Sequence, residues 1–260
     1  MIMPRAKIYK GKKVRNKRWS NRVQHLLRPY YRNHAWVGIY SDTFDIFVKI
    51  LAKRTKNRQQ NVIMVEGDTG SGKSTFAIQL AFALAKALGK EFSLTKDYIY
   101  SIDDLWKKLE DPDASPISLI DEAVLVLNSK RSQSNDSVDI VNLFNTMRSR
   151  GWSTILCAPS IKLINKDVRC LHVDYDVYCS SEDNSFVPDI GRGLFELSKM
   201  KRKRFSKKSS DEPYQMLLST GVFRALPKKI DDEYQPIKNQ AQDTLIANAL
   251  ARRKKAMAKG

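Results

Sequence analysis

Nine consecutive residues of the chain (GDTGSGKST, residues 67–75) have the types and spacing needed to hold a phosphate group. They contain the pattern GxxxxGK[ST], whose glycines let backbone N–H groups turn toward an anion. In this pattern Lys73 reaches the β- and γ-phosphates of a nucleotide and the Ser74 hydroxyl binds Mg²⁺. Thr75 is placed to contact the α-phosphate. The predicted nucleotide-binding residues are Gly67, Asp68, Thr69, Gly70, Ser71, Gly72, Lys73, Ser74 and Thr75.

A second motif, Asp121-Glu122, directly follows the apolar segment ISLI. An aspartate at a strand tip can hold Mg²⁺ through water, and the next glutamate can accept a proton from an attacking water molecule. Kinases of small molecules need no such water activator, so the glutamate favours hydrolysis. We therefore predict Ser74 and Asp121 as the metal ligands, with Lys73 and Glu122 as catalytic residues. The alternative is that Asp121 only caps the helix expected to follow it.

Apolar periodicity places both motifs at the ends of strands. Residues 61–66 (NVIMVE) are predicted as a buried strand, followed by the loop and an amphipathic helix that ends at Gly89. Strands that alternate with helices predict an α/β fold with a mainly parallel central sheet flanked by helices. Further strands are expected near residues 98–100 and at 117–122, 152–158, 171–180 and 193–200, the last as an edge strand.

The pattern of composition divides the chain into three predicted parts. Residues 1–40 form a basic arm, residues 41–200 the nucleotide-hydrolysing core, and residues 201–260 a basic C-terminal extension. Within this extension, residues 214–227 (YQMLLSTGVFRALP) are expected to form a small element and residues 243–260 a basic helix.

The charge of the chain points to a polyanion partner. The formal net charge is +18, and the first acidic residue is Asp42. DNA or RNA bound without sequence preference is the simplest partner, because lysine and arginine contact phosphates of any sequence, and an acidic membrane surface is the next. The alternatives are a disordered arm that aids solubility and a well-solvated lysine-rich surface.

Neither the cysteines nor the apolar segments suggest export or membrane insertion. The three cysteines form no CxxC pair, so we expect no disulfide framework or zinc site and a cytoplasmic location. No membrane span is expected, because the most apolar helix, residues 76–88, is short and contains Gln79 and Lys86.

The two motifs together resemble those of P-loop ATPases with an additional catalytic glutamate, which share a RecA-like core. The resemblance implies ATP as the nucleotide. It also implies that the strand WSTILCA lies between the phosphate-loop strand and the Asp121 strand, with a polar sensor residue at its tip. Here that tip reads Cys157-Ala158-Pro159-Ser160.

The segment NTMRSRGWSTILCAPSIKLINKDVR narrows this resemblance to the FtsK-HerA group of DNA-pumping ATPases. The likeness covers about residues 60–175 and implies a homo-oligomeric ring. Viral packaging, conjugation and Zot-like proteins belong to this group, and a packaging motor would be associated with the virion. The group usually has a glutamine near the strand tip, whereas this chain has Cys157, with Ser160 as the possible substitute.

Two further features could serve such a ring. Arg148 and Arg150 end a predicted helix, and the resemblance implies that one of them reaches a neighbouring subunit's nucleotide as an arginine finger. The alternative is a pair of arginines at a helix C-terminus exposed to water. Lys130 and Arg131 lie in a polar loop that could face DNA or only solvent.

The function predicted from these features is an ATP-hydrolysing DNA translocase or a motor for genome packaging or DNA transfer. An AAA+ replication initiator or helicase loader is one alternative, although residues 211–236 resemble poorly the helical lid that such proteins need. A DNA-binding switch with slow ATP turnover is the other.

Overall fold

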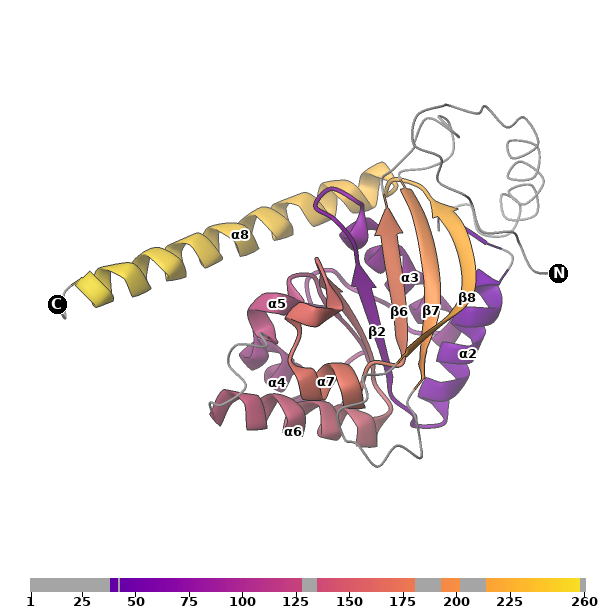
Figure 1. Ribbon diagram of the computed structural model, residues 1–260, viewed down its shortest axis with the longest axis horizontal. Helices are drawn as coiled ribbons and strands as arrows, with labels where there is room; N and C mark the ends of the chain where they lie inside the picture. The colour runs from indigo at the N-terminus through magenta and orange to yellow at the C-terminus, as the bar shows by residue number, and fades with distance from the viewer. Residues whose placement is uncertain (1–37, 42, 128–134, 181–192, 202–213, 258–260) are drawn as a thin grey trace.

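The computed structural model of the chain describes residues 38–41, 43–127, 135–180, 193–201 and 214–257 (Figure 1). Residues 1–37 of the expected arm lie outside the described residues, as do Lys130 and Arg131. The elements are β1 (Ile39–Tyr40), α2 (Phe44–Lys56), β2 (Asn61–Glu66), α3 (Lys73–Leu88), β3 (Tyr98–Ile99), α4 (Ile102–Glu110), β4 (Ile117–Ile120), α5 (Ala123–Val126), α6 (Asn135–Arg150), β5 (Ser153–Ala158), the 3₁₀ helix η2 (Ile161–Leu163), α7 (Lys166–Leu171), β6 (Tyr175–Ser180), β7 (Gly193–Lys201), β8 (Tyr214–Phe223) and α8 (Lys228–Met257).

All the described strands form one sheet with the order β1-β8-β7-β6-β2-β5-β4-β3. The pairings β6-β2, β2-β5, β5-β4 and β4-β3 are parallel, and those that add β7, β8 and β1 are antiparallel. The sheet is therefore mainly parallel, and the predicted RecA-like P-loop NTPase fold is confirmed. β5 lies between β2 and β4, as the resemblance to P-loop ATPases implies.

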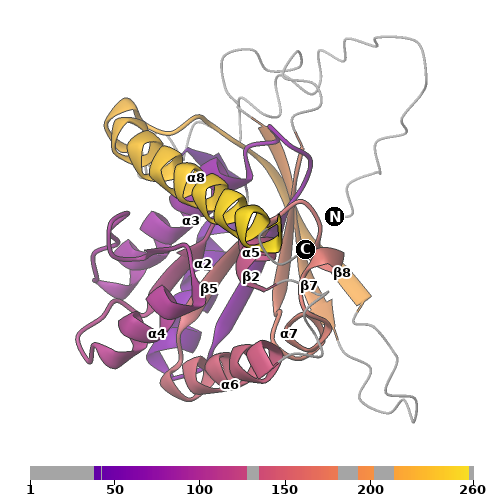
Figure 2. The same ribbon diagram turned by 90° about the vertical axis from the view of Figure 1, so that its left-hand side faces the viewer.

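Helices cover both faces of the parallel part of the sheet (Figure 2). On β2, Ile63 and Val65 belong to the core cluster that contains α2 and α3. Val62 and Met64 belong to the opposite cluster, with residues of α4, α5, α6 and α7. Because both faces of β2 are buried, its sequence is a continuous apolar run rather than an alternating one.

Helix α3 has the glycine boundaries that the sequence predicts. Gly72 precedes it, and Gly89 ends it in the left-handed conformation, with a φ of 67°. In the part of the chain that the structure describes, no helix has both the length and the apolar composition to cross a bilayer.

The prediction of an edge strand at residues 193–200 is wrong. β7 lies inside the sheet, between β6 and β8, with a β-bulge between Leu197 and Ser198 in its pairing with β8. Buried and exposed residues alternate in the first half of β7, because only one face of the strand packs on the helices. Edge strands often have the same alternation, so the pattern does not distinguish the two positions. Its outer partner β8 comes from beyond residue 200, where the sequence indicates only a small element.

A buried ion pair holds β3 and α4 together. The Lys108 ammonium lies 2.7 Å from an oxygen of Asp97, and both side chains are almost fully buried. The other Asp97 oxygen accepts a hydrogen bond from the backbone N–H of Ser93, at 2.7 Å. Losing one partner would leave an uncompensated buried charge, so the pair fixes the start of β3.

Asp176 on β6 is a buried acid with an incomplete set of hydrogen bonds. Its side chain is 2% exposed in a strand that lies between β2 and β7. Gln215 donates to its Oδ2 at 2.6 Å, whereas Oδ1 has no partner among the described residues. Burial, with a smaller contribution from the Glu66 charge, raises the pKa of Asp176 to about 8.

This raised pKa predicts a loss of stability at alkaline pH. Folding favours the protonated acid, so its stabilising effect is full below the ordinary carboxyl pKa and is lost as pH rises through about 8. Between about pH 6 and about pH 9, the free energy of unfolding should fall by roughly 2 kcal/mol more in the wild type than in Asp176→Asn. Denaturant unfolding at both pH values measures this difference. The control is Glu196→Gln at an exposed position of β7. Equal pH dependence in the wild type and Asp176→Asn would contradict the prediction.

Candidate nucleotide site

The phosphate loop connects the carboxyl end of β2 to the amino end of α3. Its three glycines have positive φ angles, 142° at Gly67, 81° at Gly70 and 87° at Gly72. A Cβ atom at Gly67 would stand 2.1 Å from the carbonyl oxygen of Cys179, so only glycine fits there. The loop thereby brings the free backbone N–H groups at the start of α3 to the edge of the sheet, where an anion can be held.

Lys73, the first residue of α3, lies over this loop. Its ammonium donates hydrogen bonds to the carbonyl oxygens of Gly67, at 2.9 Å, and Asp68, at 2.8 Å. The side chain is therefore folded back across the space enclosed by the loop. The carbonyl oxygens are neutral, so a negatively charged phosphate oxygen would attract the ammonium more strongly and draw the side chain to itself.

Asp121 follows β4, and the order β2-β5-β4 puts it at the same edge of the sheet as the phosphate loop. Its carboxyl group is 7% exposed, and Oδ1 has no hydrogen-bond partner in the described part of the chain. The Ser71 hydroxyl oxygen is likewise buried and unpartnered there. A carboxylate oxygen with free lone pairs and the Ser74 hydroxyl form a hard oxygen donor set that fits Mg²⁺ with nucleotide phosphates and water as the other ligands.

Glu122 is the residue that precedes α5, and it makes no capping hydrogen bond to that helix. The residue at the N-cap position of α5 is therefore Glu122 and not Asp121. The alternative that Asp121 only caps this helix is wrong. Burial and the neighbouring Asp121 charge raise the pKa of Glu122, while Lys73 and Lys238 lower it. The net direction is upward, which makes its carboxylate a stronger base.

The comparison with known families agrees with this geometry. The family model described as Novel STAND NTPase 3 matches residues 47–209, more than half of the chain. The chain belongs to this family. It is therefore a P-loop NTPase, and the match does not single out the FtsK-HerA group. A search of curated proteins finds no significant match.

In this STAND NTPase the tip of β5 places a thiol beside the predicted metal ligand. Cys157 is fully buried, and burial together with the charge of Asp121 raises its pKa well above that of an ordinary thiol. Ser160 instead caps η2, where its hydroxyl accepts from the Lys162 N–H at 3.3 Å. Of the two positions considered for a sensor, Cys157 is thus the one that faces the Asp121 carboxylate.

Two tyrosines that sequence reasoning missed contact the predicted metal ligand Asp121. The hydroxyl of Tyr98 donates to Asp121 Oδ2 at 2.5 Å, and that of Tyr234 donates to the same oxygen at 2.9 Å. Tyr234 belongs to α8, within the segment expected only as a basic extension. The two rings also contact each other, with centroids 6.0 Å apart. Tyr98 could have been suspected from its place at a strand tip, but no spacing rule signals Tyr234.

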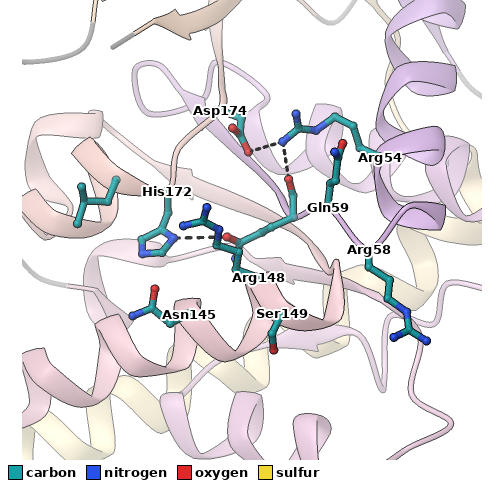
Figure 3. A pocket seen from close by; sticks show the side chains of 10 residues that line it. Arg54, Arg58, Gln59, Asn145, Arg148, Ser149, His172 and Asp174 are labelled. Carbon is teal, nitrogen blue, oxygen red and sulfur yellow. Dashed lines mark hydrogen bonds and ion pairs between the residues drawn. The ribbon is translucent and has the colours of Figure 1, made fainter. Parts of the chain in front are cut away.

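Arg148, predicted as a finger, lines a cavity of about 520 Å³ that Figure 3 shows from close by. On one side of the cavity, Arg54 contacts Asp174 at 3.4 Å. On another side, a ring nitrogen of His172 lies 3.4 Å from the side-chain oxygen of Gln60. The cavity lies at the amino end of β2, whose six residues separate it from the phosphate loop by roughly 20 Å.

Arg150 lies near the same edge of the sheet, where its guanidinium donates to the carbonyl oxygen of Leu109. Neither Arg148 nor Arg150 is at the phosphate loop of its own chain. A finger role for either arginine therefore requires a neighbouring subunit, and it stays a prediction.

Proposed function

We propose that this NTPase hydrolyses ATP bound with Mg²⁺ and uses the reaction to move DNA, as a translocase or as a packaging or DNA-transfer motor. The observation that carries the hydrolytic part is the meeting of two motifs at one sheet edge. Lys73 and Glu122 come from different strand–loop junctions, yet the Lys73 charge acts on the Glu122 carboxylate. A phosphate held by Lys73 would thus lie close to a base able to activate water.

The residues of the chain divide the chemistry among them. The loop N–H groups and Lys73 hold and polarise the phosphates, while Ser74 and Asp121 hold the metal. Bound Mg²⁺ supplies positive charge that neutralises the charge developing on the phosphoryl group. Glu122 takes a proton from the attacking water, and its raised pKa suits that task.

Charge supports DNA as the partner. The net charge of +18 is large for 260 residues, and no acidic residue precedes Asp42. Contacts of lysine and arginine with phosphates release counterions and do not depend on base sequence. The choice of a motor in a ring rests on the resemblance to the FtsK-HerA group and on Arg148 and Arg150 acting in trans.

A second candidate function is an ATP-dependent DNA-binding switch with slow turnover. One observation favours it, the hydrogen bond of Tyr234 to Asp121, because a helix held on a metal ligand can report whether nucleotide is bound. An AAA+ initiator or loader receives less support, because β8 and the single helix α8 are the elements described after β7.

The steady-state rate of ATP hydrolysis, measured with and without DNA, tests the proposal. A motor should be stimulated severalfold by long duplex DNA, and less by short duplexes at the same total nucleotide concentration, because translocation ends at each DNA end. A switch should bind DNA only with ATP present and hydrolyse slowly with either DNA. Hydrolysis that is fast and indifferent to DNA, together with no DNA binding, would contradict both functions.

A further inference from the structure

The hydroxyl of Tyr234 contacts one of the two predicted magnesium ligands. It donates to Asp121 Oδ2 at 2.9 Å, and the Ser74 side chain lies near enough to influence the pKa of the tyrosine. The tyrosine is 3% exposed, so this contact is part of the packed structure rather than a surface encounter. A neutral hydroxyl group therefore occupies the Asp121 oxygen that Mg²⁺ or its bridging water would otherwise use.

Helix α8 crosses the carboxyl edge of the sheet near the tip of β2 (Figures 1 and 2). The Tyr100 hydroxyl donates to the carbonyl oxygen of Ile237 at 3.0 Å and ties the next turn of α8 to the end of β3. Lys238 lies with its ammonium 5.7 Å from the Tyr234 ring centroid, and its charge reaches Glu122. One short stretch of α8 thus contacts or influences both halves of the proposed active site.

The same stretch of α8 contains a proline that interrupts its backbone hydrogen bonds. Pro236 lies inside the helix, two residues after Tyr234. Proline has no N–H group, so the helix lacks one backbone hydrogen bond there. The turn that carries Tyr234 therefore depends more on its contacts with the sheet edge than an uninterrupted helix would.

We propose that α8 is an autoinhibitory latch, in which Tyr234 holds Asp121 and must leave before Mg-nucleotide can bind. The proposal rests on the function proposed above, because it requires Ser74 and Asp121 to be the metal ligands. The closed latch and bound Mg²⁺ exclude each other. The apparent affinity for Mg-ATP is thus the intrinsic affinity reduced by the fraction of molecules with the latch open.

The first test is the dissociation constant of ATP measured by calorimetry on the full chain, with Mg²⁺ and with EDTA. Tyr234→Phe keeps the ring but removes the hydroxyl, and loss of a hydrogen bond to a charged group should raise the affinity for Mg-ATP about tenfold. ATP in EDTA should bind both proteins within about twofold, because the hydroxyl blocks the metal position and not the loop. The control is Tyr175→Phe, a buried tyrosine on β6 that packs against Phe47.

The second test needs no variant and follows α8 itself. Hydrogen–deuterium exchange of the backbone amides at residues 228–240 should rise when Mg-ATP is added to the wild type. ATP in EDTA should raise the exchange much less. Tyr98→Phe removes the other hydrogen bond to Asp121 from β3 and should leave exchange in α8 at the wild-type level, whereas Tyr234→Phe should raise it without nucleotide.

The outcomes separate the latch from the underlying function. If Mg-ATP binds the wild type and Tyr234→Phe equally and α8 stays protected when it is bound, the latch is wrong while the nucleotide site stands. Binding to Tyr234→Phe but not to the wild type would be the strongest support for the latch. If neither protein binds Mg-ATP, both the latch and the proposed nucleotide site are overturned.

Discussion

Replacing Lys73 with alanine is expected to weaken Mg-ATP binding at least a hundredfold, which is about 2.7 kcal/mol. The ammonium lies over the phosphate loop, where it donates to the carbonyl oxygens of Gly67 and Asp68. Turning to the phosphates breaks no ion pair among the described residues. A charged donor in a partly enclosed loop gives strong hydrogen bonds to phosphate oxygens, and alanine supplies none.

Calorimetric titration with Mg-ATP measures this effect. Lys90→Ala is the matched control, because Lys90 is exposed just after the same helix α3. Thermal unfolding of both variants checks that the loop remains folded. An affinity of Lys73→Ala within about threefold of the wild type would mean that the phosphates bind elsewhere.

Glu122→Gln should have the opposite profile, with normal Mg-ATP affinity and a rate of hydrolysis lowered roughly 10²- to 10⁴-fold. The amide has nearly the shape of the acid but cannot accept the proton of the attacking water. Glu122 makes no capping bond to α5, so the substitution should leave the local fold intact. In the wild type, the rate should also fall on acidification, because a protonated Glu122 is no longer a base and its pKa is raised.

Single-turnover hydrolysis with saturating Mg-ATP separates this chemical step from binding. Glu110→Gln provides a control at the exposed end of α4. If Glu122→Gln hydrolyses ATP at the wild-type rate, another group activates the water. Together with Lys73→Ala, this variant distinguishes a residue that holds the nucleotide from one that acts on it.

Much of the proposed site could be predicted because its parts are local. The phosphate loop is a run of adjacent residues, and its glycines have the positive φ angles that the motif requires. The position of Asp121 follows from a short apolar strand that ends beside it. The resemblance to P-loop ATPases implies that β5 lies between the strands of the two motifs. The pairing of β5 with both β2 and β4 confirms this strand order.

Contacts between distant segments could not be predicted in this way. The alternating pattern of β7 records how each face of the strand is buried, not whether another strand lies alongside it. Its partner β8 begins only at Tyr214, and the periodicity does not indicate that the two strands pair antiparallel. The location of Arg148 near the amino end of β2, far from the phosphate loop, likewise follows from the direction in which α6 crosses the sheet.

The sequence by itself determined that this chain has a phosphate loop, a strand-end Asp-Glu pair and alternating strands and helices. Those features depend on backbone conformation and apolar period over a few neighbouring residues. Only the tertiary structure decided that Tyr234 meets Asp121, because the two residues are 113 positions apart. Their contact depends on how β8 and α8 pack against the rest of the chain, and no local propensity encodes it.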